Sequence, residues 1–73
     1  MTYKYELELE QIYKYIKKNQ DVSEADVRKE LMFSEIVVSN VFSFLLGAEK
    51  IRLHRVVGRS KLYKVNKVIK NGS

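Results

Sequence analysis

Two helix-start signals in close succession constrain the fold of this chain more than any other feature. In Ser23-Glu24-Ala25-Asp26, the Ser23 hydroxyl and the Asp26 carboxylate have the spacing of a capping box. A second start, Ser34, follows directly after Met32 and Phe33. Each cap is also flanked by two apolar residues with the spacing of a hydrophobic staple, in which the residue before the cap packs against the first turn of the helix. These pairs are Val22 with Val27 and Phe33 with Val38. The sequence therefore predicts two short helices, over about 23–31 and 34–46, joined by a tight turn.

A further helix is predicted ahead of these two, over about 5–18. The apolar residues that recur there at helical spacing on one face are Tyr5, Leu9, Ile12 and Ile16. The same segment also fits a strand, because Tyr3, Tyr5, Leu7 and Leu9 alternate with charged residues. In the helical interpretation Tyr3 and Leu7 point away from the core face. They are then either a dimer contact or simply two exposed apolar side chains.

The helix over 34–46 has a distinct inner and outer face. Its predicted buried face consists of Val38, Val41, Phe42 and Leu45. The opposite face carries Ile36, Ser39, Asn40, Ser43 and Gly47, with Val37 and Phe44 on one flank. We expect Gly47 to help end this helix.

After residue 49 the apolar period changes from helical spacing to alternation. Ile51 and Leu53 alternate with Arg52 and His54, and Tyr63 and Val65 alternate with Lys64 and Asn66. Between them, Gly58 supplies the glycine that a hairpin turn favours. This pattern predicts a two-stranded ribbon over about 50–57 and 60–66 with a basic outer face and an apolar inner face. The fold class is therefore α+β and mainly helical, in a single domain over 1–73 with a frayed tail at 68–73.

Composition excludes several classes of function. The chain has 73 residues, no Cys and one His, so it has no thiolate site and no set of histidines for a metal. The carboxylates lie in a scaffold segment or fit turn and cap positions, which leaves no catalytic group. No apolar run is long enough to span a membrane. We expect an intracellular, cytoplasmic module that is no enzyme and uses no cofactor, metal or small-molecule effector. Because so short a chain builds a thin core, a homodimer is expected.

Charge is distributed unevenly along the chain. The formal net charge is +5, with 14 Lys and Arg against 9 Asp and Glu. Residues 1–30 are nearly neutral, whereas Glu35 and Glu49 are the only acidic residues in 31–73. A concentrated positive field attracts polyanions and speeds their association. This asymmetry favours a nucleic-acid partner over a merely solubilising surface.

Two short helices joined by a three-residue turn and followed by a β-hairpin resemble the winged helix-turn-helix domains of bacterial and archaeal transcription regulators. The segments that carry the likeness are Val22-Ser23-Glu24-Ala25-Asp26-Val27-Arg28-Lys29-Glu30-Leu31, Ser34 through Leu45, Ile51-Arg52-Leu53-His54-Arg55 and Gly58-Arg59-Ser60-Lys61-Leu62-Tyr63. The resemblance covers about residues 7–67. Stand-alone domains of this size are similar to those of archaeal viruses and plasmids.

The resemblance implies double-stranded DNA as the partner of a homodimeric transcription regulator, near the nucleoid or in a host cytoplasm. The third helix is then expected in the major groove and the wing on the backbone or minor groove. The candidate DNA contacts on the helix are Ser34, Ile36, Val37, Ser39, Asn40 and Ser43, and those on the wing are Arg52, His54, Arg55, Arg59, Ser60, Lys61 and Lys64. Asn40 is the candidate base contact, because a carboxamide pairs with the adenine edge through two hydrogen bonds. Together with Ile36 near a thymine methyl, and Arg59 in a narrow minor groove, it suggests an A·T-rich site.

One feature favours an alternative function. The outward face of the third helix contains no Arg or Lys, although Arg on guanine is the commonest specific base contact. Glu35 lies near the helix start, where it either accepts from cytosine or stabilises the helix dipole. Val37, Phe44 and Leu46 make this helix more apolar than is usual for one that contacts bases. The alternative is a winged-helix module that docks a partner protein through the third helix.

Overall fold

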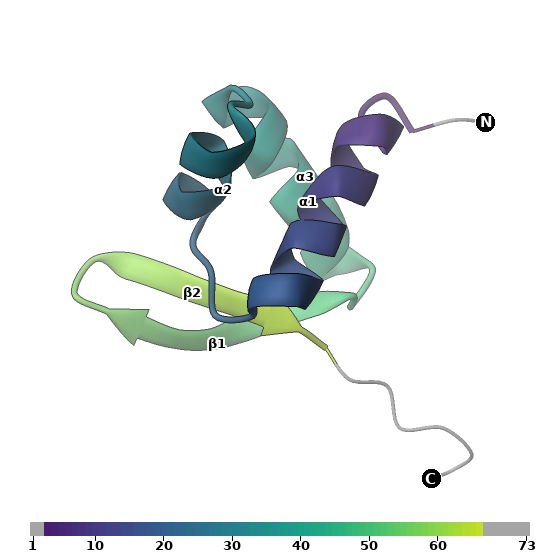
Figure 1. Ribbon diagram of the computed structural model, residues 1–73. Helices are drawn as coiled ribbons and strands as arrows, with labels where there is room; N and C mark the ends of the chain where they lie inside the picture. The colour runs from purple at the N-terminus through teal and green to yellow at the C-terminus, as the bar shows by residue number, and fades with distance from the viewer. Residues whose placement is uncertain (1–2, 67–73) are drawn as a thin grey trace, which may run out of the picture.

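Three helices are followed by a two-stranded antiparallel hairpin in the computed structural model, which describes residues 3–66 (Figure 1). The elements are α1 (Glu6–Asn19), α2 (Glu24–Leu31), α3 (Glu35–Gly47), β1 (Ile51–Val57) and β2 (Ser60–Val65). This order confirms the α+β, mainly helical, winged helix-turn-helix layout, and each element lies within one residue of its expected bounds. The predicted frayed tail at 68–73 lies outside the described residues.

The helices pack together above the base of the hairpin, whose turn projects beyond α2 (Figure 1). The core is formed by side chains from all three helices, the strands and the α1–α2 connection: Ile12, Ile16, Val22, Val27, Val38, Val41, Phe42, Leu45, Ile51 and Tyr63. Phe42 of α3 meets the edge of the Tyr63 ring of β2, with ring centroids 5.2 Å apart at an interplanar angle of 73°. This aromatic pair joins the third helix to the hairpin.

The segment before α1 departs from the expected geometry. α1 begins at Glu6, so the strand interpretation is wrong for Glu6–Leu9, and Tyr3 and Tyr5 precede the helix. Leu7 is 71% exposed, as the helical interpretation predicted. Tyr3, in contrast, is half-buried and packs against the core cluster, so the expectation that it points away was wrong. The helical pattern did not extend to Tyr3, because the chain turns back before α1.

The turn between α2 and α3 is fixed at both ends by local hydrogen bonds. The capping box of α2 is confirmed: Asp26 N–H donates to Ser23 Oγ, and Ser23 N–H donates to Asp26 Oδ2, both at 3.1 Å. Met32 ends α2 in the left-handed conformation, with φ of 61°. Ser34 then caps α3 by accepting the Val37 N–H at 3.3 Å. Three residues thereby reverse the chain and set the direction of α3.

The C-terminus of α3 is closed by two backbone hydrogen bonds. Glu49 N–H donates to the Leu46 carbonyl at 3.0 Å, and Lys50 N–H donates to the Leu45 carbonyl at 2.9 Å, which is the Schellman pattern. The helix ends at Gly47, near the expected position, but the left-handed residue is Glu49, with φ of 59°. Gly47 therefore does not supply the left-handed conformation that often ends a helix at glycine.

Val22, in the α1–α2 connection, pairs with β2 at the edge opposite β1. Val22 N–H donates to the Tyr63 carbonyl at 2.9 Å, and Tyr63 N–H donates to the Val22 carbonyl at 2.7 Å. The Gln20 side chain adds a bond by accepting the Val65 N–H at 3.2 Å. β2 is therefore held between β1 and the α1–α2 connection. A single extended residue has no periodicity, so the sequence did not reveal this pairing.

Candidate nucleic-acid interface

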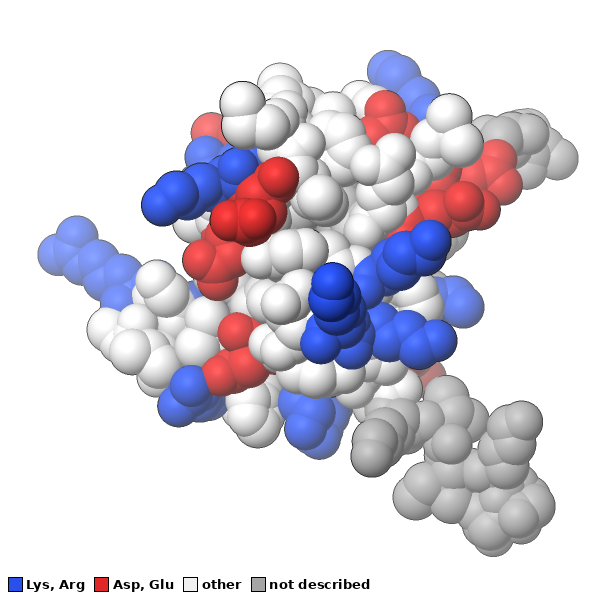
Figure 2. Space-filling model, in the orientation of Figure 1, with Lys and Arg blue, Asp and Glu red and all other residues white. Residues whose placement is uncertain are grey.

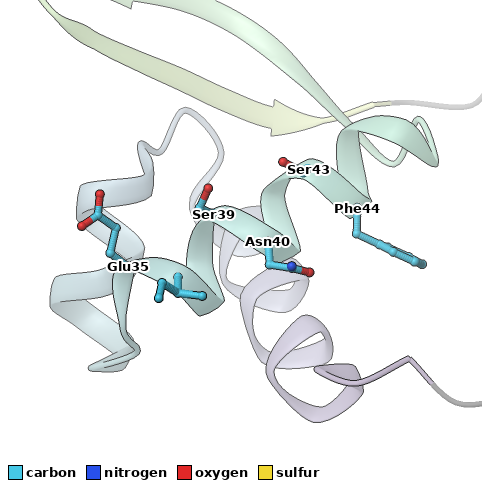
Figure 3. Close-up of a pocket in the computed structure, with 6 residues that line it drawn as sticks. Glu35, Ser39, Asn40, Ser43 and Phe44 are labelled. Carbon is cyan, nitrogen blue, oxygen red and sulfur yellow. The ribbon is translucent and has the colours of Figure 1, made fainter.

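The outward face of α3 forms one continuous exposed surface. A shallow hollow on it is lined by Glu35, Ile36, Ser39, Asn40, Ser43 and Phe44 (Figure 3). Its formation follows from helical spacing, because Val38, Val41, Phe42 and Leu45 on the opposite face are fully or almost fully buried in the core. Ile36, Ser39, Asn40 and Ser43, all predicted as contact residues, thus share one surface. Ser34 is also exposed, at the N-terminal cap of the helix.

Two residues of α3 differ from their predicted placement. Val37 was a candidate DNA contact, but it is half-buried and packs against the core. Phe44 was placed on the flank, yet it is 43% exposed and lines the same hollow as Asn40. Its position was available from the sequence, since Ile36, Asn40 and Phe44 recur every four residues on one face of a helix. The surface is therefore more aromatic than predicted.

Tyr3 reaches this surface from the segment before α1. Its hydroxyl donates a hydrogen bond to Asn40 Oδ1. Its ring lies over Phe44, with centroids 4.3 Å apart and ring planes 32° apart. The sequence gives no sign of this contact, because it joins residues far apart in the chain. Of the two proposed dimer residues, Tyr3 is thus engaged within its own monomer, and Leu7 alone is left freely exposed.

A β-bulge at His54 divides the hairpin into two parts. Before it, Arg52 is opposite Lys64 and Leu53 is opposite Tyr63; after it, Arg55 is opposite Leu62 and Val56 is opposite Lys61. Because the bulge breaks the alternation of side chains, the ribbon lacks the predicted division into a basic face and an apolar face. Leu53, Val56 and Val57 are each about half exposed, at 45%, 55% and 53%. Basic and aliphatic side chains therefore share the outer part of the wing.

The wing turn has the geometry that its glycine predicted. Gly58 has a φ of 61°, and Arg59 does not share the positive φ, as in a two-residue turn with glycine first. Arg59, Ser60 and Lys61 are exposed at or beside the turn. The N-terminus of α2 faces this end of the wing across a small hollow lined by Ser23, Glu24, Ala25, Arg59, Ser60, Lys61 and Tyr63.

One wing cation is engaged by an acidic residue. Arg55 binds the carboxylate of Asp21 through Nη2 at 2.6 Å and through Nε at 3.1 and 3.2 Å. These hydrogen bonds hold the pKa of the Asp21 carboxyl below its ordinary value, although burial opposes the shift. The positive charges of Arg55, His54 and Lys64 lower it further. Arg55 therefore fastens the wing to the α1–α2 connection and contributes less free charge than predicted.

The hairpin is the most consistently basic part of the surface. Figure 2 shows Lys and Arg side chains around the hairpin and the end of α1, whereas over α2 Asp and Glu lie among Lys and Arg. No Asp or Glu occurs between Lys50 and Asn66, and within residues 3–66 only Arg55 of the wing cations forms an ion pair. Arg52, His54, Arg59 and Lys61 are exposed, and Lys64 is half-exposed. The wing therefore presents positive charge to solvent.

Other kinds of site are not found in the described part of the chain. Across residues 3–66, no three His, Asp or Glu side chains lie close enough together to hold a metal ion. Over the same residues, no helix combines the length and the apolar content that crossing a bilayer requires.

Comparison with models of known protein families, with curated proteins and with solved structures gives no match.

Proposed function

We propose that this chain binds double-stranded DNA as a winged helix-turn-helix transcription regulator in the cytoplasm, with α3 in the major groove and the wing on the backbone. The observation that carries the proposal is the wing, where five Lys and Arg residues lie in a stretch without any acidic residue. Clustered, exposed cations of this kind bind phosphate oxygens and fix the orientation of a protein on a duplex. The exposed polar groups of α3 are short enough to let its backbone approach base edges.

The experiment is a fluorescence-anisotropy titration of a mixed-sequence duplex at several salt concentrations. If each monomer neutralises about four phosphates, log K falls with log salt at a slope of about −3.6, and twice that in a dimer. A wing variant with Arg52→Gln, Arg59→Gln, Lys61→Gln and Lys64→Gln is expected to bind on the order of 100-fold more weakly, with a much flatter slope.

A matched control removes the same charge elsewhere. Lys14→Gln, Lys17→Gln, Lys18→Gln and Lys29→Gln neutralise four exposed lysines of α1 and α2. This control is expected to lose less affinity than the wing variant, because none of these lysines belongs to the hairpin or to α3. Equal losses in both variants would mean that only net charge matters, and the absence of binding at low salt would contradict the proposal.

A specific observation also favours the second candidate, a protein-docking module. Ile36 and Phe44 of α3 are 73% and 43% exposed, and α3 contains no Lys or Arg. An exposed apolar surface without cations suits a protein partner better than a phosphate backbone. If the duplex does not bind, Ile36→Asp is the variant with which to test loss of a protein partner.

We also propose that the chain acts as a homodimer and that Leu7 of α1 lies in the interface. Leu7 is an exposed leucine on a helix that otherwise buries its apolar side chains wholly or in part. Leu7→Asp is expected to convert dimers into monomers in sedimentation velocity, because an interface does not accommodate an unpaired carboxylate. Unchanged sedimentation would remove Leu7 from the interface.

A further inference from the structure

The contact between Tyr3 and Asn40 bears directly on what α3 can recognise. Asn40 lies four residues before Phe44 on the exposed face of α3, and Figure 3 shows both side chains on one side of the helix, with Ser39 and Ser43 directed toward the hairpin. Tyr3 contacts both, through its hydroxyl on Asn40 and its ring on Phe44. Tyr5 in turn meets Tyr3 edge-on, with centroids 6.0 Å apart at 82°. Three aromatic rings therefore hold the Tyr3 hydroxyl beside Asn40.

The direction of this hydrogen bond is fixed by the chemistry of its two groups. Asn40 Oδ1 is a carbonyl oxygen and can only accept, so the Tyr3 hydroxyl donates. Burial raises the pKa of the Tyr3 hydroxyl above its ordinary value, and a charge on Tyr5 raises it further. The hydroxyl consequently keeps its proton at neutral pH. Asn40 itself stays exposed, which leaves its amide NH₂ group to face a partner.

This arrangement changes which base Asn40 can contact. Pairing with adenine needs both ends of the carboxamide, since Oδ1 accepts from N6 while Nδ2 donates to N7. Guanine instead presents two acceptors, N7 and O6, on its major-groove edge. Because the Asn40 oxygen already accepts from Tyr3, only one of its two lone pairs is left for adenine N6, whereas both amide hydrogens remain available as donors. Guanine therefore suits Asn40 better than the adenine that its residue type alone suggested.

We propose that Tyr3 is a positioning residue that commits the Asn40 amide to donating, so that α3 selects guanine at the base that Asn40 contacts. The proposal rests on the proposed DNA-binding function and specifies its sequence preference. It makes the segment before α1 part of the specificity of the α3 surface, although Tyr3 need not touch DNA itself.

The experiment selects bound duplexes from a randomised library with the full chain and compares base preferences. Wild type is expected to favour guanine at one position, and Asn40→Ala to lose that preference. Tyr3→Phe removes only the hydroxyl and keeps the ring on Phe44. It is expected to raise the affinity for adenine relative to guanine at that position by about tenfold. Tyr5→Phe is the matched control, because it removes a neighbouring hydroxyl that does not contact Asn40, and its preference should equal that of wild type.

A spectroscopic readout on the same proteins tests the contact without DNA. In ¹⁵N-¹H spectra, the Asn40 side-chain amide signals should shift in Tyr3→Phe and remain in place in Tyr5→Phe. If duplex binding is salt-dependent but Tyr3→Phe keeps the wild-type base preference, this inference is wrong and the proposed function stands. An adenine preference in wild type at the Asn40 position would overturn it in the same way. If no duplex binds at low salt, the proposed function fails and this inference fails with it.

Discussion

The outward face of α3 and the wing differ in almost every chemical respect, although one aromatic pair in the core joins them. Glu35 is the only charged residue of α3, and its exposed face is otherwise polar, aliphatic or aromatic. The wing carries five Lys and Arg residues and no acidic residue. On DNA, phosphate contacts provide affinity and orientation, whereas base contacts provide selectivity. In the proposed DNA-binding function, we expect the two surfaces to divide these tasks, with the wing providing attraction and α3 providing discrimination.

The largest expected effect comes from removing the core contact that joins the two surfaces. Phe42 is 1% exposed and meets Tyr63 of β2. Phe42→Ala should lower the free energy of unfolding by about 3–5 kcal/mol, out of about 4–11 kcal/mol for a domain of this length. Urea unfolding followed by circular dichroism measures the loss.

The control for this variant lies two residues further along the same helix. Phe44→Ala is expected to cost about 1 kcal/mol or less, because Phe44 is 43% exposed. If Phe44→Ala were as destabilising as Phe42→Ala, the division of α3 into a core face and a free face would be wrong.

A second change makes the α3 surface resemble the wing. Glu35→Lys reverses the only charge on α3 and should raise affinity for duplex DNA by about tenfold if α3 lies against the groove. Glu10→Lys makes the same charge change at an exposed position of α1 and should have a smaller effect. Salt-dependent anisotropy titrations compare the two variants. Equal gains would show that α3 is no nearer to the phosphates than α1.

A third change concerns the turn that sets the direction of α3. Met32 is 84% exposed and has a φ of 61°, a conformation that is strained for residues with a Cβ atom. Met32→Gly should therefore raise the free energy of unfolding by about 0.5–1 kcal/mol. Met32→Ala removes the same exposed side chain but keeps the Cβ atom, so thermal unfolding should show no such gain for it.

The smallest expected effect tests how the wing is fastened. The pKa of Asp21 is lowered in the folded state, chiefly by hydrogen bonds to Arg55. The stabilisation is thus complete above the ordinary carboxyl pKa of about 4. It is lost as pH falls through the lower pKa of the folded protein. In Asp21→Asn, the free energy of unfolding should therefore fall less as the pH is lowered. Urea unfolding at a series of pH values between about 7 and 2 would detect this difference.

Asp21→Asn should also strengthen binding to DNA, although it weakens the attachment of the wing. With Asp21 neutral, Arg55 is released to contact phosphate, so the salt slope should steepen by about 0.9. A variant that retained the wild-type pH dependence of stability, or its salt slope, would show that the pair between Asp21 and Arg55 does not restrain the wing.

Sequence patterns predicted the elements closely, because each pattern reflects a local interaction. Ser23 and Ser34 cap helices through hydrogen bonds to amides three residues away, and Gly58 supplies a turn conformation by itself. The exposed positions of α3 followed from helical spacing. The bulge at His54 was not predicted: the alternation in the sequence breaks where Arg55 follows His54, but only the pairing with β2 shows which residue is extra.

What the sequence alone determined is therefore the order and bounds of the elements, the core face of α3 and the positive charge of the hairpin. The tertiary structure decided which polar groups remain free. Tyr3 engages Asn40 across 37 positions of the chain, and Asp21 engages Arg55 across 34. Neither pairing has a period or a motif, since it arises only when packing of the core brings distant segments together. Local hydrogen bonds and side-chain spacing build the two surfaces, and long-range contacts set the chemistry that each surface presents.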